Sequence, residues 1–136
     1  MRVFLDANVL FSASNRSSNI ARLVALVAKD WEAVTSDIAC VEARKNLVLE
    51  RPDWLSAFEK LLGRVEIVPS ASFDLGVELD RQDVPLLCAA IRSKCRYFAT
   101  GDRRDFGHLF GKAVHGVEVI TLLRLAVLLE EDQVGE

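Results

Sequence analysis

Four acidic side chains could share one reaction centre, although they lie far apart along the chain: Asp6, Glu42, Asp83 and Asp102. Asp6 follows the apolar run 3–5 and Asp102 follows the run 97–99, and ligands of α/β proteins bind beyond such strand ends. Several carboxylates in one pocket repel each other, so some stay protonated unless a cation neutralises them. Oxygen ligands without His or Cys suit Mg²⁺ or Mn²⁺ rather than zinc. The acids therefore predict metal-dependent hydrolysis of phosphodiester bonds.

Each of these acids also has an ordinary structural role open to it. Asp6 can end a strand through an Asx turn, and Asp102 follows a glycine as turn residues do. Asp83 fits the N-cap of a helix with Pro85 in its first turn. Glu42 fits a solvated helix position, because glutamate is a good helix former. The metal hypothesis depends on all four lying together in the fold.

The elements that position the acids alternate between strands and helices. Short apolar runs predict strands at 3–5, 33–35, 65–68, 97–99 and 117–120. Helices are expected at 19–29, 37–50, 52–62, 73–79, 84–94 and 122–129, with a polar loop at 14–18 and an acidic tail at 130–136. This order predicts one α/β domain over residues 1–136, with a mostly parallel sheet covered by helices on both faces.

Composition excludes several classes of protein. The net charge of −3 argues against a general nucleic-acid coat protein, although six basic residues between 91 and 112 form a zone that suits a phosphate-bearing ligand or an ordinary solvated surface. No apolar stretch approaches the roughly 20 residues of a membrane span, and the N-terminus does not read as a signal peptide. Three cysteines without a C-x-x-C pair argue against disulfides and a Cys-based zinc site. We expect a cytoplasmic protein without a membrane role.

Other reaction classes find little support. His108 and His115 lie among glycines in an expected loop, and neither is expected to act in catalysis or metal binding. No Ser–His or Cys–His arrangement of a covalent hydrolase and no glycine-rich phosphate loop is present. A receiver-like signalling domain would need an acidic pair after the first strand and an Asp after the third, where Asn8 and Pro69-Ser70 stand instead.

Four blocks of the sequence resemble the PIN-domain family, in order and over nearly the whole chain. They are Leu5-Asp6-Ala7-Asn8-Val9-Leu10, the helix that carries Glu42, Asp83-Val84-Pro85-Leu86-Leu87-Cys88-Ala89-Ala90, and Tyr97-Phe98-Ala99-Thr100-Gly101-Asp102 with Asp105-Phe106 behind it. The third and fourth blocks are the specific ones. The chain is most similar to small prokaryotic members, especially VapC-type toxins of toxin–antitoxin pairs.

The resemblance implies a three-layer sandwich around a five-stranded parallel sheet of order 3-2-1-4-5. It implies an Mg²⁺- or Mn²⁺-dependent endoribonuclease that forms a homodimer and is inhibited by a cognate antitoxin protein. Carried over by position, Asp6, Glu42, Asp83 and Asp102 would be catalytic metal ligands, and Asp105 an outer acid or a helix N-terminal acid. Supporting and RNA-binding roles would fall to Asn8, Ser36, Thr100, Arg103 and Arg104, although Ser36 could also simply cap a helix and the arginines could be solvated charge. RNA processing outside a toxin–antitoxin pair, or a non-catalytic scaffold, remain alternatives.

Overall fold

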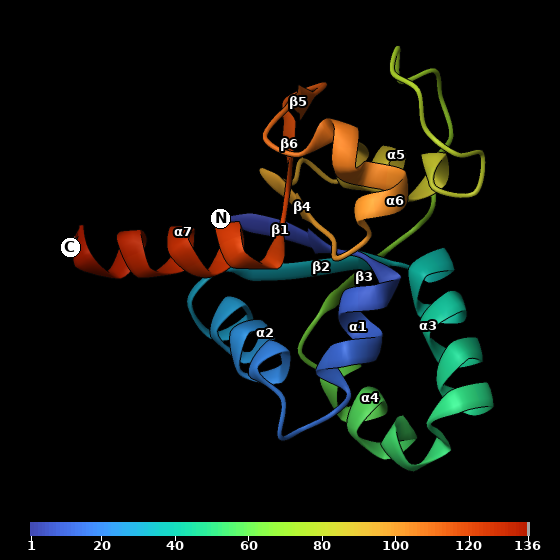
Figure 1. Cartoon of the computed structure of the whole chain (residues 1–136), viewed down its shortest axis with the longest axis vertical. Helices are drawn as coiled ribbons and strands as arrows, with labels where there is room; N and C mark the ends of the chain where they lie inside the picture. Colours follow the sequence, from blue (N-terminus) through green and yellow to red (C-terminus); the bar gives the residue numbers. More distant parts are fainter. Residues whose placement is uncertain (136) are drawn as a thin grey trace.

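A computed structural model describes residues 1–135 and shows a sheet with helices on both faces (Figure 1). The strands are β1 (Arg2–Leu5), β2 (Glu32–Ser36), β3 (Glu66–Val68), β4 (Tyr97–Ala99), β5 (Ala113–Val114) and β6 (Val117–Ile120). The α-helices are α1 (Ala7–Ala13), α2 (Asn19–Asp30), α3 (Asp37–Glu50), α4 (Leu55–Leu62), α5 (Val84–Arg92), α6 (Arg103–Phe106) and α7 (Leu122–Val134). Short 3₁₀ turns cover Pro52–Trp54 and Gly107–Leu109. None of the described helices is long and apolar enough to cross a membrane.

The sheet confirms the expected strand order and adds one strand. Its order is β3-β2-β1-β4-β6-β5, and the five expected strands all pair in parallel. The additional strand, β5, pairs antiparallel with β6 at the edge through a tight turn at His115 and Gly116, both with positive φ. Strands β1 and β4 are neighbours at the point where the chain reverses its winding, so their carboxyl ends meet there.

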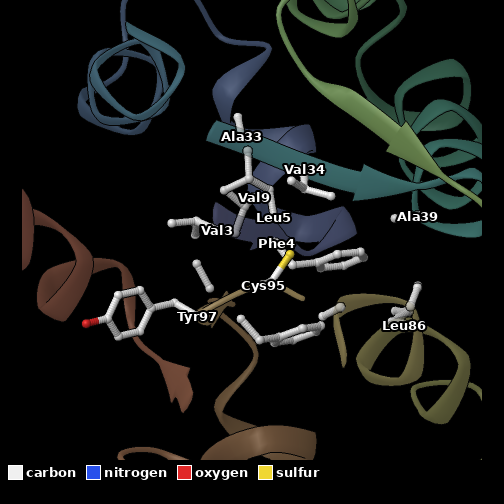
Figure 2. Close-up of a cluster of buried hydrophobic side chains, with 14 of the residues drawn as sticks. Val3, Phe4, Leu5, Val9, Ala33, Val34, Ala39, Leu86, Cys95 and Tyr97 are labelled. Carbon is white, nitrogen blue, oxygen red and sulfur yellow. The ribbon is translucent and has the colours of Figure 1, made fainter. Parts of the chain in front are cut away.

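The core packs around the central strand β1 (Figure 2). Phe4 on β1 stacks on Phe98 of β4 with ring centroids 5.2 Å apart, and Phe98 in turn contacts Phe106 of α6 at 4.9 Å. All three rings are fully buried. These contacts fix the ends of β1 and β4 and the position of α6, which are the segments that carry Asp6 and Asp102.

Three sequence-based expectations about secondary structure are wrong. Helix α1 forms at 7–13, where no helix was expected, and the expected loop at 14–18 follows it. No helix forms at 73–79, because Gly76 adopts φ +73° and the Asp74 side chain accepts a hydrogen bond from its N–H, which closes a turn. The tail from 130 is helical as far as Val134, and Glu136 lies outside the described residues.

The irregular segment 69–83, which we call the strap, joins β3 to α5 and projects beyond α5 and α6 (Figure 1, yellow-green). Two histidine rings contact its backbone: His115 Nε2 lies 3.1 Å from the Leu75 carbonyl oxygen, and His108 Nε2 lies 2.6 Å from that of Glu78. The Phe73 ring packs edge-on against His115 at 6.1 Å. The strap is therefore held by side chains rather than by a backbone ladder, and it leads directly to Asp83.

Candidate active site

The carboxyl ends of β1 and β4 open into a cavity of about 560 Å³. Its lining residues are Asp6, Ala7, Asn8, Phe11, Ser12, Ile20, Glu42, Asn46, Glu50, Asp83, Gly101, Asp102 and Leu122. The four acids singled out in the sequence thus come from four different segments to one cavity. Neither His108 nor His115 is among the lining residues of this cavity in the described chain.

Asp6 is the most completely bonded of these acids. Its Oδ1 accepts a hydrogen bond from the Ala7 N–H at 2.8 Å, so the residue caps α1. Its Oδ2 accepts from the Thr100 hydroxyl at 2.7 Å and from the Asn8 amide at 2.9 Å. The Asp6 backbone N–H also donates to the Ala99 carbonyl, which ties the end of β1 to the end of β4. Asn8 and Thr100 therefore hold the Asp6 carboxylate in one orientation.

The same two polar residues extend the network to Asp102. The Asn8 side-chain oxygen accepts from the Gly101 N–H at 2.9 Å, and the Thr100 hydroxyl oxygen accepts from the Asp102 N–H at 3.0 Å. A Cβ at position 101 would lie 3.3 Å from that Asn8 oxygen, so glycine suits this close approach. Asp102 in turn accepts from the Asp105 N–H at 3.0 Å and caps α6. The β4 acid is thus positioned through the network that holds the β1 acid.

Asp83 differs, because its Oδ2 is buried without a hydrogen-bond partner among the described residues. The residue stands at the N-terminus of α5, but its side chain makes no capping bond, so the capping interpretation is wrong. Carboxylate oxygens of Asp83, Asp102 and Asp105 lie within 4.8 Å of one another. Such a buried, unpartnered carboxyl oxygen beside two further acidic side chains fits a divalent cation, whose preferred ligands are oxygens.

The pKa values of the two buried acids, Asp6 and Asp83, are both raised, which also fits a cation site. Burial is the main cause that raises the pKa of Asp6 to about 6, with a smaller contribution from Glu42, while the bonds from Thr100, Ala7 and Asn8 lower it. Burial also raises the pKa of Asp83 well above its ordinary value, followed by its contact with Asp105 and the negative charges of Asp105, Asp6 and Asp102. A cation would relieve both effects.

The remaining predicted residues lie around this centre. Glu42 lines the cavity from an exposed position on α3. Ser36 is fully buried and caps α3 by accepting from the Ala39 N–H, which is one of the two roles expected for it. Arg103 and Arg104 are exposed on α6, and Arg104 lines a separate cavity beside Asp105 under the strap.

Four residues that were not singled out in the sequence also line the cavity: Asn46, Glu50, Phe11 and Ser12. Asn46 and Glu50 follow Glu42 at intervals of four residues on α3, so the three share one helix face. Phe11 and Ser12 belong to α1, which was not expected as a helix. The four-residue spacing from Glu42 could have indicated Asn46 and Glu50, whereas no comparable signal indicated Phe11 and Ser12.

Comparison with solved structures gives a match over most of the chain. No protein-family model matches the sequence, and no curated protein is detectably similar to it. A chain in the crystal structure of VapBC2 from Rickettsia felis, bound to a DNA fragment from their promoter, superposes with a TM-score of 0.65. The match covers 89% of this chain and 98% of that chain, at 17% sequence identity. The fold is PIN-like. At this identity the match shows the fold alone, and the PIN-like fold is the one that the sequence blocks predicted.

Proposed function

We propose that this chain is a divalent-metal-dependent endoribonuclease of the VapC type, the toxin of a toxin–antitoxin pair. The observation that carries the proposal is the buried, unpartnered Oδ2 of Asp83 in a cavity that also receives Asp6, Glu42 and Asp102. The PIN-like fold and the structural likeness to a VapBC2 chain support it.

The metal ligands proposed here are Asp83 and Asp102, with Asp6 and Glu42 directly or through water, and Asp105 as an outer acid. Bound Mg²⁺ or Mn²⁺ would supply an activated water and neutralise charge on the scissile phosphate. The chain's own contribution is orientation: Thr100 and Asn8 hold Asp6, and the Asp102 cap holds the start of α6. Arg103 and Arg104, exposed beside Asp102, are proposed to attract the phosphates of the RNA.

The proposed partners follow from the same likeness. A cognate antitoxin protein is proposed because the matching structure is that of VapBC2. Homodimerisation is supported by exposed apolar side chains along one helix, α3, at Ile38, Val41, Val48 and Leu49. Light scattering of the purified chain tests the dimer, and substitution of Val41 and Leu49 by serine should release monomers.

The deciding experiment is cleavage of a pool of single-stranded and structured RNA with Mn²⁺, with Mg²⁺ and with EDTA. We expect metal-dependent cleavage by the wild type and a loss of at least roughly 100-fold in Asp83→Asn, as for other preorganised electrostatic groups. Asp53→Asn is the matched control, because Asp53 is an exposed ion-pair partner of Arg51 outside the cavity. Absence of cleavage, together with no thermal stabilisation by either metal, would contradict the proposal.

A further inference from the structure

The cavity extends well beyond the acids. Its volume of about 560 Å³ lies in the range of small-molecule pockets, roughly 300–1,000 Å³, and exceeds what a metal ion and one phosphate need. We call the part formed by Phe11, Ser12, Asn46 and Glu50 the distal end. On α3, Asn46 and Glu50 lie about 6 and 12 Å along the helix axis from Glu42, at 1.5 Å per residue.

The charge of the cavity limits what can enter the distal end. Five carboxylates line the cavity, from Asp6, Glu42, Glu50, Asp83 and Asp102, and no lysine or arginine of the described chain is among its lining residues. A phosphate beyond the one neutralised by the metal would meet Glu50 without a counter-charge and be repelled. The cationic residues Arg103 and Arg104 lie on α6 instead. The sugar–phosphate chain is therefore directed along α6, and an uncharged group is favoured in the distal end.

The side chains of the distal end suit a nucleobase. Phe11 is partly buried and braced edge-on by Trp54, with centroids 5.6 Å apart, so it offers a fixed aromatic wall on which a base can stack. The side chains of Asn46 and Glu50 have no hydrogen-bond or ion-pair partner within residues 1–135. An asparagine amide can pair with adenine, and a glutamate carboxylate accepts from an exocyclic amino group.

Resting on the proposed function, we propose that the distal end is a nucleoside subsite for one unpaired RNA base, stacked on Phe11 and read by Asn46 and Glu50. An ionised carboxylate only accepts hydrogen bonds, and the exocyclic amino groups of adenine, cytosine and guanine donate to it. Uracil has a carbonyl oxygen, O4, where cytosine has its amino group, and offers only its ring N3–H, so the subsite favours the amino-bearing bases over uracil. A paired base could not turn into the cavity, so the subsite requires an unpaired base.

Binding can be measured separately from cleavage. Trp54 packs on Phe11 and the chain has only one other tryptophan, so a Trp31→Phe variant makes Trp54 the sole indole reporter. With Ca²⁺ in place of Mn²⁺ to slow cleavage, oligo(A) and oligo(C) pentanucleotides should change Trp54 emission at concentrations roughly 5- to 150-fold below oligo(U), the range that one good base contact provides. Glu50→Gln and Asn46→Ala should reduce this ratio to within about twofold, and Glu130→Gln on α7, exposed and outside the cavity, is the matched control.

Cleavage provides the second readout, with wild-type Trp31. In a uridine tract that carries a single adenosine or cytidine, wild type with Mn²⁺ should cut beside the amino-bearing base, and Glu50→Gln should cut without that preference. RNA cleavage without a preference for the amino-bearing base in any variant would overturn the proposed subsite but not the proposed nuclease activity. No cleavage by wild type, together with no thermal stabilisation by Mn²⁺, would overturn the proposed function, while the fluorescence ratio would still decide base binding. A response of Trp54 to an oligo-arginine peptide and to none of the oligonucleotides would assign the acidic cavity to a cationic peptide and overturn the subsite.

Discussion

Asp6 and Asp83 enter the same cavity with similar burial, but the segments behind them are built differently. Asp6 extends the central strand of the sheet, and three donors hold its two carboxylate oxygens. Asp83 ends the irregular strap, and one of its oxygens has no partner among the described residues. The fold itself therefore fixes the Asp6 half of the site, while the Asp83 half retains an unpartnered oxygen that the proposed cation would bind.

The largest effect expected from this difference is an unusual pH dependence of the metal-free protein. Because folding raises the carboxyl pKa of Asp6 from about 3.9 to about 6, its contribution to stability is fully present below about pH 4 and is lost as pH rises through 6. The loss is about 3 kcal/mol for Asp6 alone. Asp83, also raised, extends the decline to higher pH.

Urea unfolding between pH 4 and 8 in EDTA and in Mn²⁺ checks this prediction. The free energy of unfolding should fall with rising pH in EDTA, and Mn²⁺ should flatten the curve because it favours the ionised carboxylates. Metal-free stability that rises over this interval would show that the acids are not buried together as the structure has them.

The second prediction sets the two acids against each other by the same substitution. Asp6→Asn points an amide N–H₂ at the donors that now bond the carboxylate, which costs about 1–3 kcal/mol and offsets the relief of a buried charge. Its free energy of unfolding should therefore lie about 1–3 kcal/mol below that of Asp83→Asn, which loses no such bonds. Asp83→Asn replaces a buried carboxyl group that makes no capping bond and whose raised pKa already disfavours its charge, so it should leave metal-free stability unchanged or raise it.

Chemical denaturation of both variants at pH 7 in EDTA measures the contrast. If Asp83→Asn were destabilised as much as Asp6→Asn, Asp83 would have a structural partner, and the inference that its Oδ2 lacks one would be wrong. Asp105→Asn is a useful companion, because removal of its negative charge should also relieve Asp83.

The third prediction concerns the strap that carries Asp83. His115→Ala removes both the contact to the Leu75 carbonyl and the packing on Phe73, so the strap should loosen while the Asp6 network stays intact. We expect Mn²⁺ affinity to fall by roughly 10- to 100-fold, as for other residues that orient metal ligands. Isothermal titration gives the affinity, and limited proteolysis within 69–83 reports the loosening.

The conservative variant His115→Gln distinguishes loss of the contact that positions the strap from general destabilisation of the fold. His115→Gln keeps a side-chain donor for the carbonyl and should recover part of the affinity, whereas Lys112→Ala, an exposed change nearby, should leave it unchanged. Equal affinity in His115→Ala and wild type would mean that the strap does not depend on its histidines to position Asp83.

The same contrast between the two acids shows which features of the fold could be predicted from the sequence. The strands and the acids at their ends were predictable, because apolar runs define β1 and β4 and parallel strands bring their ends to one edge. The strap was not predictable, because the apolar residues at 73–79 resemble a helix. A local turn at Asp74 and Gly76, together with tertiary contacts to His108 and His115, holds the irregular path instead. Likewise, α7 continues into the acidic residues where Asp132 accepts from the Trp31 indole, a contact between residues 101 positions apart.

The smallest expected effect tests whether Ser36 belongs to the site or only to the scaffold. Ser36 ends β2, one strand away from Asp6, and its hydroxyl accepts from the Ala39 N–H at the start of the helix that carries Glu42. Ser36→Ala should lower the free energy of unfolding by about 1 kcal/mol, the usual effect of a lost N-cap. Thr121→Ala, which removes the equivalent cap of α7, is the matched control and should lower the free energy of unfolding by about as much.

Since a capping serine acts only through helix stability, both variants should retain wild-type Mn²⁺ affinity at temperatures well below unfolding. A Ser36→Ala protein that binds Mn²⁺ tenfold more weakly while Thr121→Ala does not would move Ser36 into the group that orients the acids, and the well-ordered half of the site would then extend from β1 and β4 to β2.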